Sequence, residues 1–242
     1  MTEPITFKNA DGTELSGILH AADGDNAAII AHGFTSSKDR PRFSRLADML
    51  IDASITAFRF DFGGCGESEE RPITVHAQVK DLEAAIALVR RRYRNIMLIG
   101  HSLGGLTALS CPEGITTMVL WAPVTQAKIP TLFLDEKKRQ ELEEKGEVIF
   151  RRQGRSYRIP HEYFEERTAL DSEKLLNNVR CPILIIHGDG DHTVPIEHSS
   201  AAVEKLPEGS RLDVVHAGHD LDEDMDQVLA RTVEWCKHAD ME

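Results

Sequence analysis

Long apolar runs are absent from this sequence. No stretch approaches the length of a transmembrane helix, and the first residues, Met1 to Pro4, lack the basic and apolar regions of a secretory signal. An excess of positive charge is also absent, because 28 Lys and Arg stand against 40 Asp and Glu, giving a formal net charge of −12. A nucleic-acid-binding protein usually shows a basic face. We therefore expect a cytoplasmic protein that binds neither nucleic acid nor a membrane.

Cysteine is scarce, and its spacing matches no known pairing motif. The four cysteines, Cys65, Cys111, Cys181 and Cys236, form no C-x-x-C motif, and the H-E-x-x-H motif does not occur. In a reducing compartment such cysteines are free thiols. Acidic and histidine side chains near the C-terminus offer another set of possible metal ligands: Asp189, Asp191, His192, His216, His219, Asp222 and Glu223. Their spacing matches no zinc motif, so we expect neither a metal nor a cofactor.

The chain does contain a regular alternation of short apolar segments with amphipathic ones. Strands are expected at residues 5–8, 14–20, 27–31, 55–60, 95–99, 115–121, 182–186 and 211–216, and helices at 43–50, 74–91, 105–109, 196–206 and around 225–235. The first two strands, separated by Asn-Ala-Asp-Gly, predict a hairpin. Strands that alternate with helices predict an α/β fold, a mostly parallel twisted sheet with helices on both faces. The 242 residues fit a single domain over 1–242.

This alternation breaks between Val124 and Val179. The stretch holds a dense mixed-charge run, Asp135–Glu147, and then a basic one, Arg151–Arg158. About fifty residues without a strand–helix pattern predict an insertion at about 124–179. It is either a solvated helical excursion or a cap that shapes a pocket. We favour a cap, because the insertion lies between two strands whose ends carry the residues described next.

The most informative motif is Gly100-His101-Ser102-Leu103-Gly104, which reads G-x-S-x-G. It lies between an expected strand and an expected helix. A serine at such a tight turn is lifted out of the sheet with its hydroxyl exposed, and the small flanking residues let the backbones pass closely. The motif predicts a nucleophilic serine, Ser102, for which a structural turn is the alternative.

A serine hydroxyl needs a neighbouring base, and the base needs an orienting carboxylate. The loop after the strand at 182–186 offers two acids, Asp189 and Asp191. The loop after the strand at 211–216 offers two bases, His216 and His219. Both loops follow parallel strands, where an open α/β sheet places its site. The order Ser, Asp, His is that of the α/β-hydrolase triad.

An oxyanion hole would complete the arrangement. One donor is expected to be the backbone N–H of Leu103, directly after the serine, and the second the N–H of Phe34, in the loop after the strand at 27–31. Gly33 permits the sharp turn that would aim it.

Taken together, these segments resemble the α/β-hydrolases over essentially the whole chain. The segments that carry the resemblance are His32-Gly33-Phe34, Asp61–Ser68, Gly100–Gly105, His187–Pro195 and Gly218-His219-Asp220. In that family the acid commonly follows the His-Gly glycine by three residues and precedes Val-Pro, and the base commonly follows a glycine near the last helix. The resemblance therefore implies Asp191 as the acid and His219 as the base.

Other polar residues of these segments are expected to be structural. His32 and His187 are expected to hydrogen-bond backbone groups under the site, and His101 flanks the nucleophile. Asp61 is expected to build a tight loop with the glycines that follow it, and Cys65 to pack within that loop.

Size and cap placement are similar to those of small feruloyl/cinnamoyl-type esterases. A looser similarity, to mammalian relatives of the acyl-protein thioesterase type, rests on Tyr157–Pro160 and Tyr163-Phe164. The implied function is hydrolysis of small-molecule carboxylic esters, short-chain or aromatic, through an acyl-enzyme on Ser102. An acyl thioesterase would use the same residues, an exopeptidase would need a pocket carboxylate, and a binding or signalling protein on this fold is the non-enzymatic alternative.

The aromatic side chains of the predicted cap either pack it onto the core or line the pocket, and we favour packing for most of them. They are Phe133, Phe150, Tyr157, Tyr163 and Phe164. No residue pattern specifies an oligomeric state.

Overall fold

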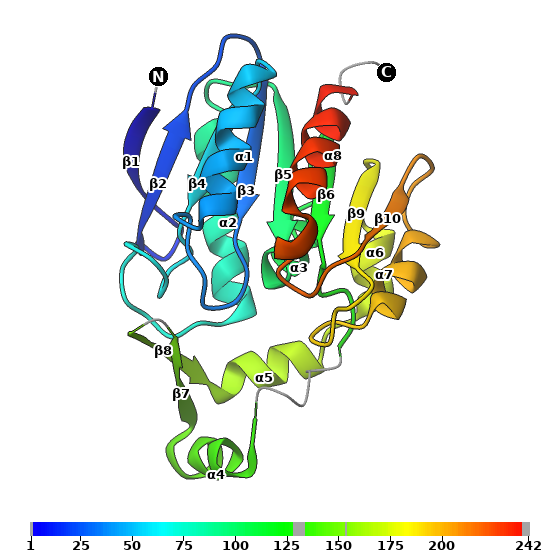
Figure 1. The fold of residues 1–242 in the computed structure, drawn as a ribbon. Coiled ribbons are helices and arrows are strands. Elements are labelled where there is room, and N and C mark those ends of the chain that lie inside the picture. Colours follow the sequence, from blue (N-terminus) through cyan, green and yellow to red (C-terminus); the bar gives the residue numbers. More distant parts are fainter. Residues whose placement is uncertain (1, 128–133, 153, 239–242) are drawn as a thin grey trace.

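The computed structural model describes residues 2–127, 134–152 and 154–238 (Figure 1). Its main feature is an eight-stranded sheet in the order β1-β2-β4-β3-β5-β6-β9-β10. The strands are β1 (Thr2–Lys8), β2 (Glu14–His20), β3 (Asn26–Ala31), β4 (Thr56–Phe60), β5 (Asn95–His101), β6 (Thr117–Trp121), β9 (Ile183–Gly188) and β10 (Arg211–Val215). β2 runs antiparallel to both its neighbours, whereas every pair from β4 to β10 is parallel. The predicted α/β fold and N-terminal hairpin are confirmed.

Helices cover both faces of this sheet. α1 (Pro41–Asp52) and α8 (Met225–His238) lie on one face, and α2 (Val75–Val89), α3 (Leu103–Leu109), α6 (Ser172–Asn177) and α7 (Ile196–Val203) on the other (Figure 1). Strands covered on both faces are apolar along their whole length. β9 follows this rule, since all six of its residues are buried. The sheet is therefore a rigid support for the loops at its carboxyl edge.

Most element boundaries differ from the predicted ones by one to three residues. The boundary difference that matters most for the site is at β9, which continues through His187 and Gly188 instead of ending at Ile186. β5 likewise runs through Gly100 to His101. Sheet pairing extends both strands, because β10 pairs with β9 as far as Gly188 and β6 pairs with β5 as far as His101.

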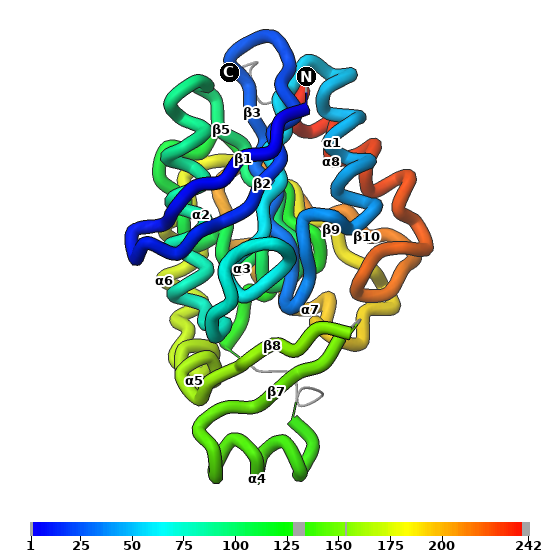
Figure 2. The backbone as a smooth tube through the Cα atoms, turned by 90° about the vertical axis from the view of Figure 1, so that its left-hand side faces the viewer, coloured from blue at the N-terminus to red at the C-terminus, as the bar shows by residue number. Residues whose placement is uncertain are grey.

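From α4 to α5, the chain between β6 and β9 lies beyond the carboxyl ends of the parallel strands (Figure 1). We call residues 134–168, without 153, the insertion segment. It contains α4 (Glu136–Lys145), β7 (Glu147–Arg152), β8 (Arg155–Pro160) and α5 (His161–Thr168), and α6 follows it on a face of the sheet. β7 and β8 pair as an antiparallel hairpin that runs beneath the sheet (Figure 2). The hairpin was not expected in the helical excursion considered from sequence as one alternative. Its charged, exposed positions hide the alternation of buried Val148 and Ile159 with outward-facing residues.

Besides the two apolar clusters between the sheet and the helices on its faces, a third apolar cluster joins the insertion segment to the sheet. Val148 and Ile159 of the hairpin and Tyr163 of α5 pack with Leu103 and Leu106 of α3. Because burial of apolar side chains is favourable, this cluster holds the segment over the turn that precedes α3. Among the described residues, no helix combines the length and the apolar character needed to cross a bilayer.

Candidate active site

Ser102 lies at the turn between β5 and α3, as the motif predicts. Its backbone has a positive φ of 55° with ψ −113°, a conformation that L-residues adopt only when the surroundings hold them there. The Ser102 N–H donates to the Trp121 carbonyl at 2.8 Å, and the Val124 N–H donates to the Ser102 carbonyl at 3.1 Å. The neighbouring strand thus holds the turn in its strained conformation.

The glycines of the motif are required by close backbone contacts. A Cβ at Gly104 would lie 2.2 Å from the Ala31 carbonyl oxygen, and one at Gly100 would lie 2.6 Å from the Gly104 oxygen. Real Cβ atoms do not approach backbone oxygens so closely. The start of α3 is therefore pressed against the end of β3, which brings the loop after β3 beside Ser102.

A chain of hydrogen bonds runs from Ser102 to His219 and Asp191. The Ser102 Oγ lies 2.8 Å from His219 Nε2, and His219 Nδ1 lies 2.7 Å from Asp191 Oδ2. His219 follows β10 and Asp191 follows β9, so three strand ends contribute one side chain each. Since Asp191 can only accept when ionised, His219 Nδ1 carries the proton and Nε2 faces the serine as an acceptor.

Four N–H groups surround the Asp191 carboxylate. Oδ1 accepts from the backbone of Thr193 at 2.7 Å and Val194 at 2.9 Å, and Oδ2 accepts from His219 and, at 3.1 Å, from His187. Burial on its own would raise the pKa of Asp191, but the hydrogen bonds from His187 and His219 outweigh it and hold the pKa well below its usual range. The carboxylate is therefore ionised at any pH near neutrality.

The second acid and the second histidine pair with each other, away from Ser102. Asp189 Oδ2 lies 3.1 Å from His216 Nδ1, and the His216 side chain is 97 % exposed. The hydrogen bond to Asp189 raises the pKa of His216, and the same bond lowers that of Asp189. This pair braces two surface loops and does not contact the serine.

His187 has a partner that sequence reasoning missed. It contacts the Val194 carbonyl at 3.0 Å, which confirms the expected backbone bond, but its Nε2 also contacts Asp191, and its Nδ1 lies 2.7 Å from Ser199 Oγ. Both neighbours of Nε2 are acceptors, so Nε2 carries the proton and Nδ1 accepts from Ser199. The fully buried ring thus fixes the position of Asp191. The His-Gly-x-x-Asp spacing after a strand was the available signal.

The loop after β3 is held by buried polar groups. His32 Nδ1 donates to the Gly33 carbonyl at 2.8 Å, and His32 Nε2 accepts from the Phe62 N–H at 3.1 Å, as expected for a structural histidine. Burial lowers the pKa of His32, which keeps it neutral. The Asp61 carboxylate accepts from the backbone N–H and the Nζ of Lys38, at 2.7 and 2.8 Å. These contacts fix the turn that carries Gly33 and Phe34.

Asp61 also builds the glycine loop that follows it. It accepts from the Glu67 N–H at 2.9 Å, and a Cβ at Gly66 would collide with its carboxylate. Cys65 packs inside this loop, where burial raises the pKa of its thiol to about 12. Among the described residues, one group of side chains has metal-ligand spacing: Asp39, Asp61 and Glu67. The Lys38 ammonium bonds to all three carboxylates, so a cation already occupies their centre.

A cavity of about 240 Å³ opens beside Ser102. The described residues of its wall are Gly33, Phe34, Ser36, Arg42, His101, Ser102, Arg152, Thr193, His219 and Asp220. Phe34 is the aromatic side chain of this wall. Its ring packs against Phe150 at 5.6 Å and Tyr163 at 5.4 Å between ring centroids.

The aromatic side chains of the insertion segment therefore pack it rather than line the described wall. Tyr157, Tyr163 and Phe164 are buried in the third apolar cluster, with Phe150 packed on its edge. Phe133 lies outside the described residues.

His101, next to the serine, is buried in its neutral form. Its Nε2 donates to the His219 carbonyl at 3.1 Å. Burial, followed by the charge of Arg42, lowers the pKa of His101 to about 3. An unfolded chain would bind this proton near pH 6.5, so the contribution of His101 to stability is complete above that pH and is lost as the pH falls toward 3.

We expect His101→Gln to reduce the acid sensitivity of folding. Glutamine can still donate to the His219 carbonyl but does not titrate. Between pH 7 and pH 5, the free energy of unfolding should fall by about 2 kcal/mol less in this variant than in the wild type. Urea unfolding at the two pH values measures this, with exposed His76→Gln as the control. Equal pH dependence in His101→Gln and the wild type would contradict the assignment.

Comparison with known proteins shows which family this chain is similar to. A sequence model of the alpha/beta hydrolase family matches residues 28–232. The uncharacterized protein YfhR of Escherichia coli O157:H7 is 26% identical over 239 residues, which cover 91% of this chain and 74% of YfhR. The human serine hydrolase BPHL is 27% identical over 218 residues, covering 81% of this chain and 73% of BPHL.

Among solved structures, Est1E of Butyrivibrio proteoclasticus with ferulic acid bound superposes with a TM-score of 0.82. The alignment covers 98% of this chain and 100% of Est1E, at 21% sequence identity. The shared architecture supports the α/β-hydrolase fold described above.

Proposed function

This chain belongs to the α/β-hydrolase family, and from that premise we propose that it is a serine hydrolase that cleaves carboxylic esters through an acyl-enzyme on Ser102. The observation that carries the proposal is the hydrogen-bond chain Ser102–His219–Asp191, with contacts of 2.8 and 2.7 Å. Nucleophile, base and orienting acid within hydrogen-bond reach form the arrangement that activates a serine.

In the proposed reaction, Ser102 Oγ attacks the ester carbonyl while His219 Nε2 takes its proton. The tetrahedral intermediate collapses as His219 gives that proton to the leaving alcohol, which leaves the acyl group on Oγ. Water then attacks the acyl carbonyl, losing a proton to His219, and the acid departs as Ser102 is reprotonated. Asp191 holds the productive tautomer of His219 and stabilises its charged form at each step.

The backbone N–H groups of Leu103 and Phe34 are the proposed oxyanion donors. Leu103 is the first residue of α3, where N–H groups have no partner within the helix and the helix dipole is positive. Phe34 follows Gly33 in the loop that the Gly104 contact brings beside Ser102. One such donor is worth about 3–4 kcal/mol in the transition state.

We further propose that the insertion segment acts as a cap of the single domain. Its hairpin packs on α3, and Arg152 of β7 is part of the cavity wall. A cavity of about 240 Å³ is smaller than the ~300–1,000 Å³ typical of pockets for drug-sized ligands. This size favours esters with a short acyl chain.

The test combines active-site labelling with a chain-length series. We expect a fluorophosphonate to add once, on Ser102, as read by intact mass and peptide mapping. We expect p-nitrophenyl esters from acetate to decanoate to be hydrolysed, with kcat/KM falling steeply beyond about six carbons because the cavity is small.

If the folded protein shows no labelling and no turnover, the proposal is contradicted. That result would favour a binding protein on this fold. Faster turnover of acyl thioesters than of matched oxygen esters would assign the same residues to a thioesterase.

A further inference from the structure

Two arginines stand in the wall of the cavity that holds Ser102. Arg42 comes from α1 and Arg152 from the end of β7, and both lie near Asp220. Asp220 is the acidic member of the described wall. Near neutral pH the side chains of the described wall therefore sum to a net positive charge, although the chain has a formal charge of −12 and Asp222, outside the wall, also contacts Arg42 at 3.4 Å. An uncharged ester gives no reason for this local reversal of sign.

Asp220 is already neutralised by Arg42. The Arg42 guanidinium donates to the Asp220 carbonyl at 2.5 Å and to its carboxylate at 2.7 Å. Burial would raise the pKa of Asp220, but the hydrogen bond from Arg42 outweighs it, so the carboxyl stays ionised and paired. A substrate amine would have to break this pair to find a carboxylate in the described wall, which disfavours the exopeptidase alternative.

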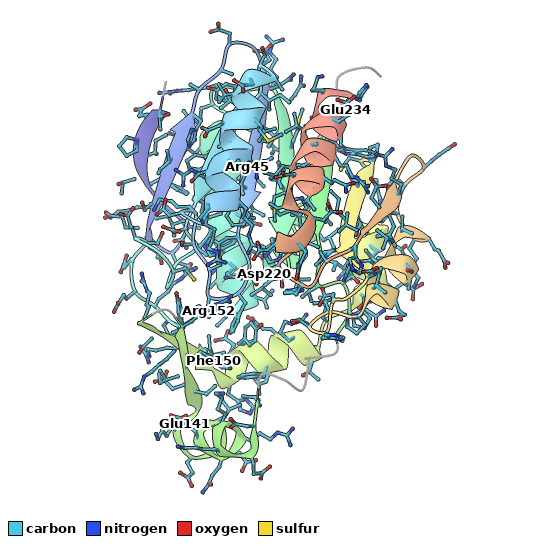
Figure 3. All side chains as sticks on the ribbon, viewed as in Figure 1. Arg45, Glu141, Phe150, Arg152, Asp220 and Glu234 are labelled. Carbon is cyan, nitrogen blue, oxygen red and sulfur yellow. The ribbon has the colours of Figure 1, made fainter. Side chains whose placement is uncertain are left out.

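Arg152 is the available cation. It lies 4.0 Å from Asp220 Oδ2, beyond hydrogen-bond distance, and its side chain is 47 % exposed (Figure 3). The Nε of Arg42, which is 5 % exposed, has no hydrogen-bond partner among the described atoms. Guanidinium groups bind carboxylates through two parallel N–H bonds, so one side chain suffices to recognise an anion.

We propose that this cavity selects small esters that carry an ionised carboxylate in addition to the ester group, and that Arg152 is the residue that binds this carboxylate. The inference rests on the proposed ester hydrolysis and adds the substrate class. The carboxylate belongs to the acyl part or to the alcohol part of the ester. In either case it lies within a few bonds of the reacting carbonyl, because the cavity is small.

Two pairs of substrates test the proposal at pH 7.5, with product release followed by NMR. The first pair places the carboxylate on the acyl side: monomethyl glutarate against methyl 5-methylhexanoate, in which an isopropyl group replaces the carboxylate. The second places it on the alcohol side: 4-acetoxybutanoate against 4-methylpentyl acetate. In at least one of the two pairs, kcat/KM of the wild type should be about tenfold or more higher for the anionic ester than for the neutral one. This ratio corresponds to the free energy of one charge-assisted hydrogen bond.

Arg152→Gln should abolish this preference, mainly by raising KM for the anionic ester, and should lower kcat/KM for the anionic ester far more than for its neutral partner. Arg151→Gln is the matched control, because Arg151 is the exposed neighbour on the same strand and lies outside the cavity wall. It should keep the preference of the wild type.

The outcomes separate this proposal from the proposed function. Equal or better turnover of the neutral ester in both pairs would overturn the selectivity and leave ester hydrolysis standing. A preference that Arg152→Gln retains would overturn the role of Arg152. Absence of turnover for all four esters and of fluorophosphonate labelling would instead remove the proposed function itself.

Discussion

Ser102→Ala is expected to lower kcat for ester hydrolysis by roughly 10⁴- to 10⁶-fold and to abolish fluorophosphonate labelling. The reason is that the proposed acyl-enzyme forms on Ser102 Oγ, and no other hydroxyl is hydrogen-bonded to His219 among the described contacts. Alanine keeps the Cβ and the backbone bonds to Trp121 and Val124 that hold the turn. The fold should therefore be retained, which circular dichroism and the melting temperature will verify.

Ser110→Ala provides the matched control for this variant. Ser110 lies at the opposite end of α3, where its hydroxyl donates to the Leu106 carbonyl at 2.9 Å. Its loss should leave kcat within about twofold of the wild type, because Ser110 is not part of the cavity wall. A folded Ser102→Ala protein that keeps wild-type turnover would contradict the nucleophile assignment.

The fold could be predicted from local pattern because each element carries its own signal. The apolar runs of β3 and β9 are too short for helices, and the spacing of apolar residues in α2 is helical. The hairpin of the insertion segment escaped prediction because its sequence is dominated by arginine and glutamate. Its buried residues gain their partners only when α3 lies against them.

The candidate site, like the fold, has residues that could be predicted from sequence and residues that could not. Ser102, Asp191 and His219 follow strands in recognisable motifs, so their loops could be predicted to meet at one edge of the sheet. The sequence offered two acids and two histidines, and it was the family resemblance that chose between them. In the structure, Asp191 and His219 form the hydrogen-bond chain to Ser102, and Asp189 is bonded to His216.

Arg42 and Arg152 could not be predicted as part of the cavity. They stand 110 positions apart in the sequence, in a helix and a hairpin, and neither belongs to a motif. Their meeting depends on how the insertion segment packs over the sheet, which is a property of the tertiary structure. The support of Asp191 by His187 was missed for a related reason, because β9 extends two residues further than its apolar run indicates.

Asp191→Asn is expected to lower kcat by roughly 10⁴-fold. All four groups that bind the Asp191 carboxylate are N–H donors: two from Thr193 and Val194 at Oδ1, and two from His187 and His219 at Oδ2. An amide has one accepting oxygen, so its NH₂ group must face donors whichever way it turns. If it faces His219, the ring adopts the tautomer with the proton on Nε2, which then cannot take the proton of Ser102.

Asp189→Asn makes the same chemical change two residues away and is the matched control. Asp189 also accepts from a histidine, but that histidine is His216, and the pair is exposed and remote from Ser102. Steady-state kinetics of the two variants with one p-nitrophenyl ester should give a ratio of about 10⁴ in kcat, with Asp189→Asn within about twofold of the wild type. The reverse ratio would assign the orienting acid to Asp189, and equal losses would show that both carboxylates act through the stability of their shared loop.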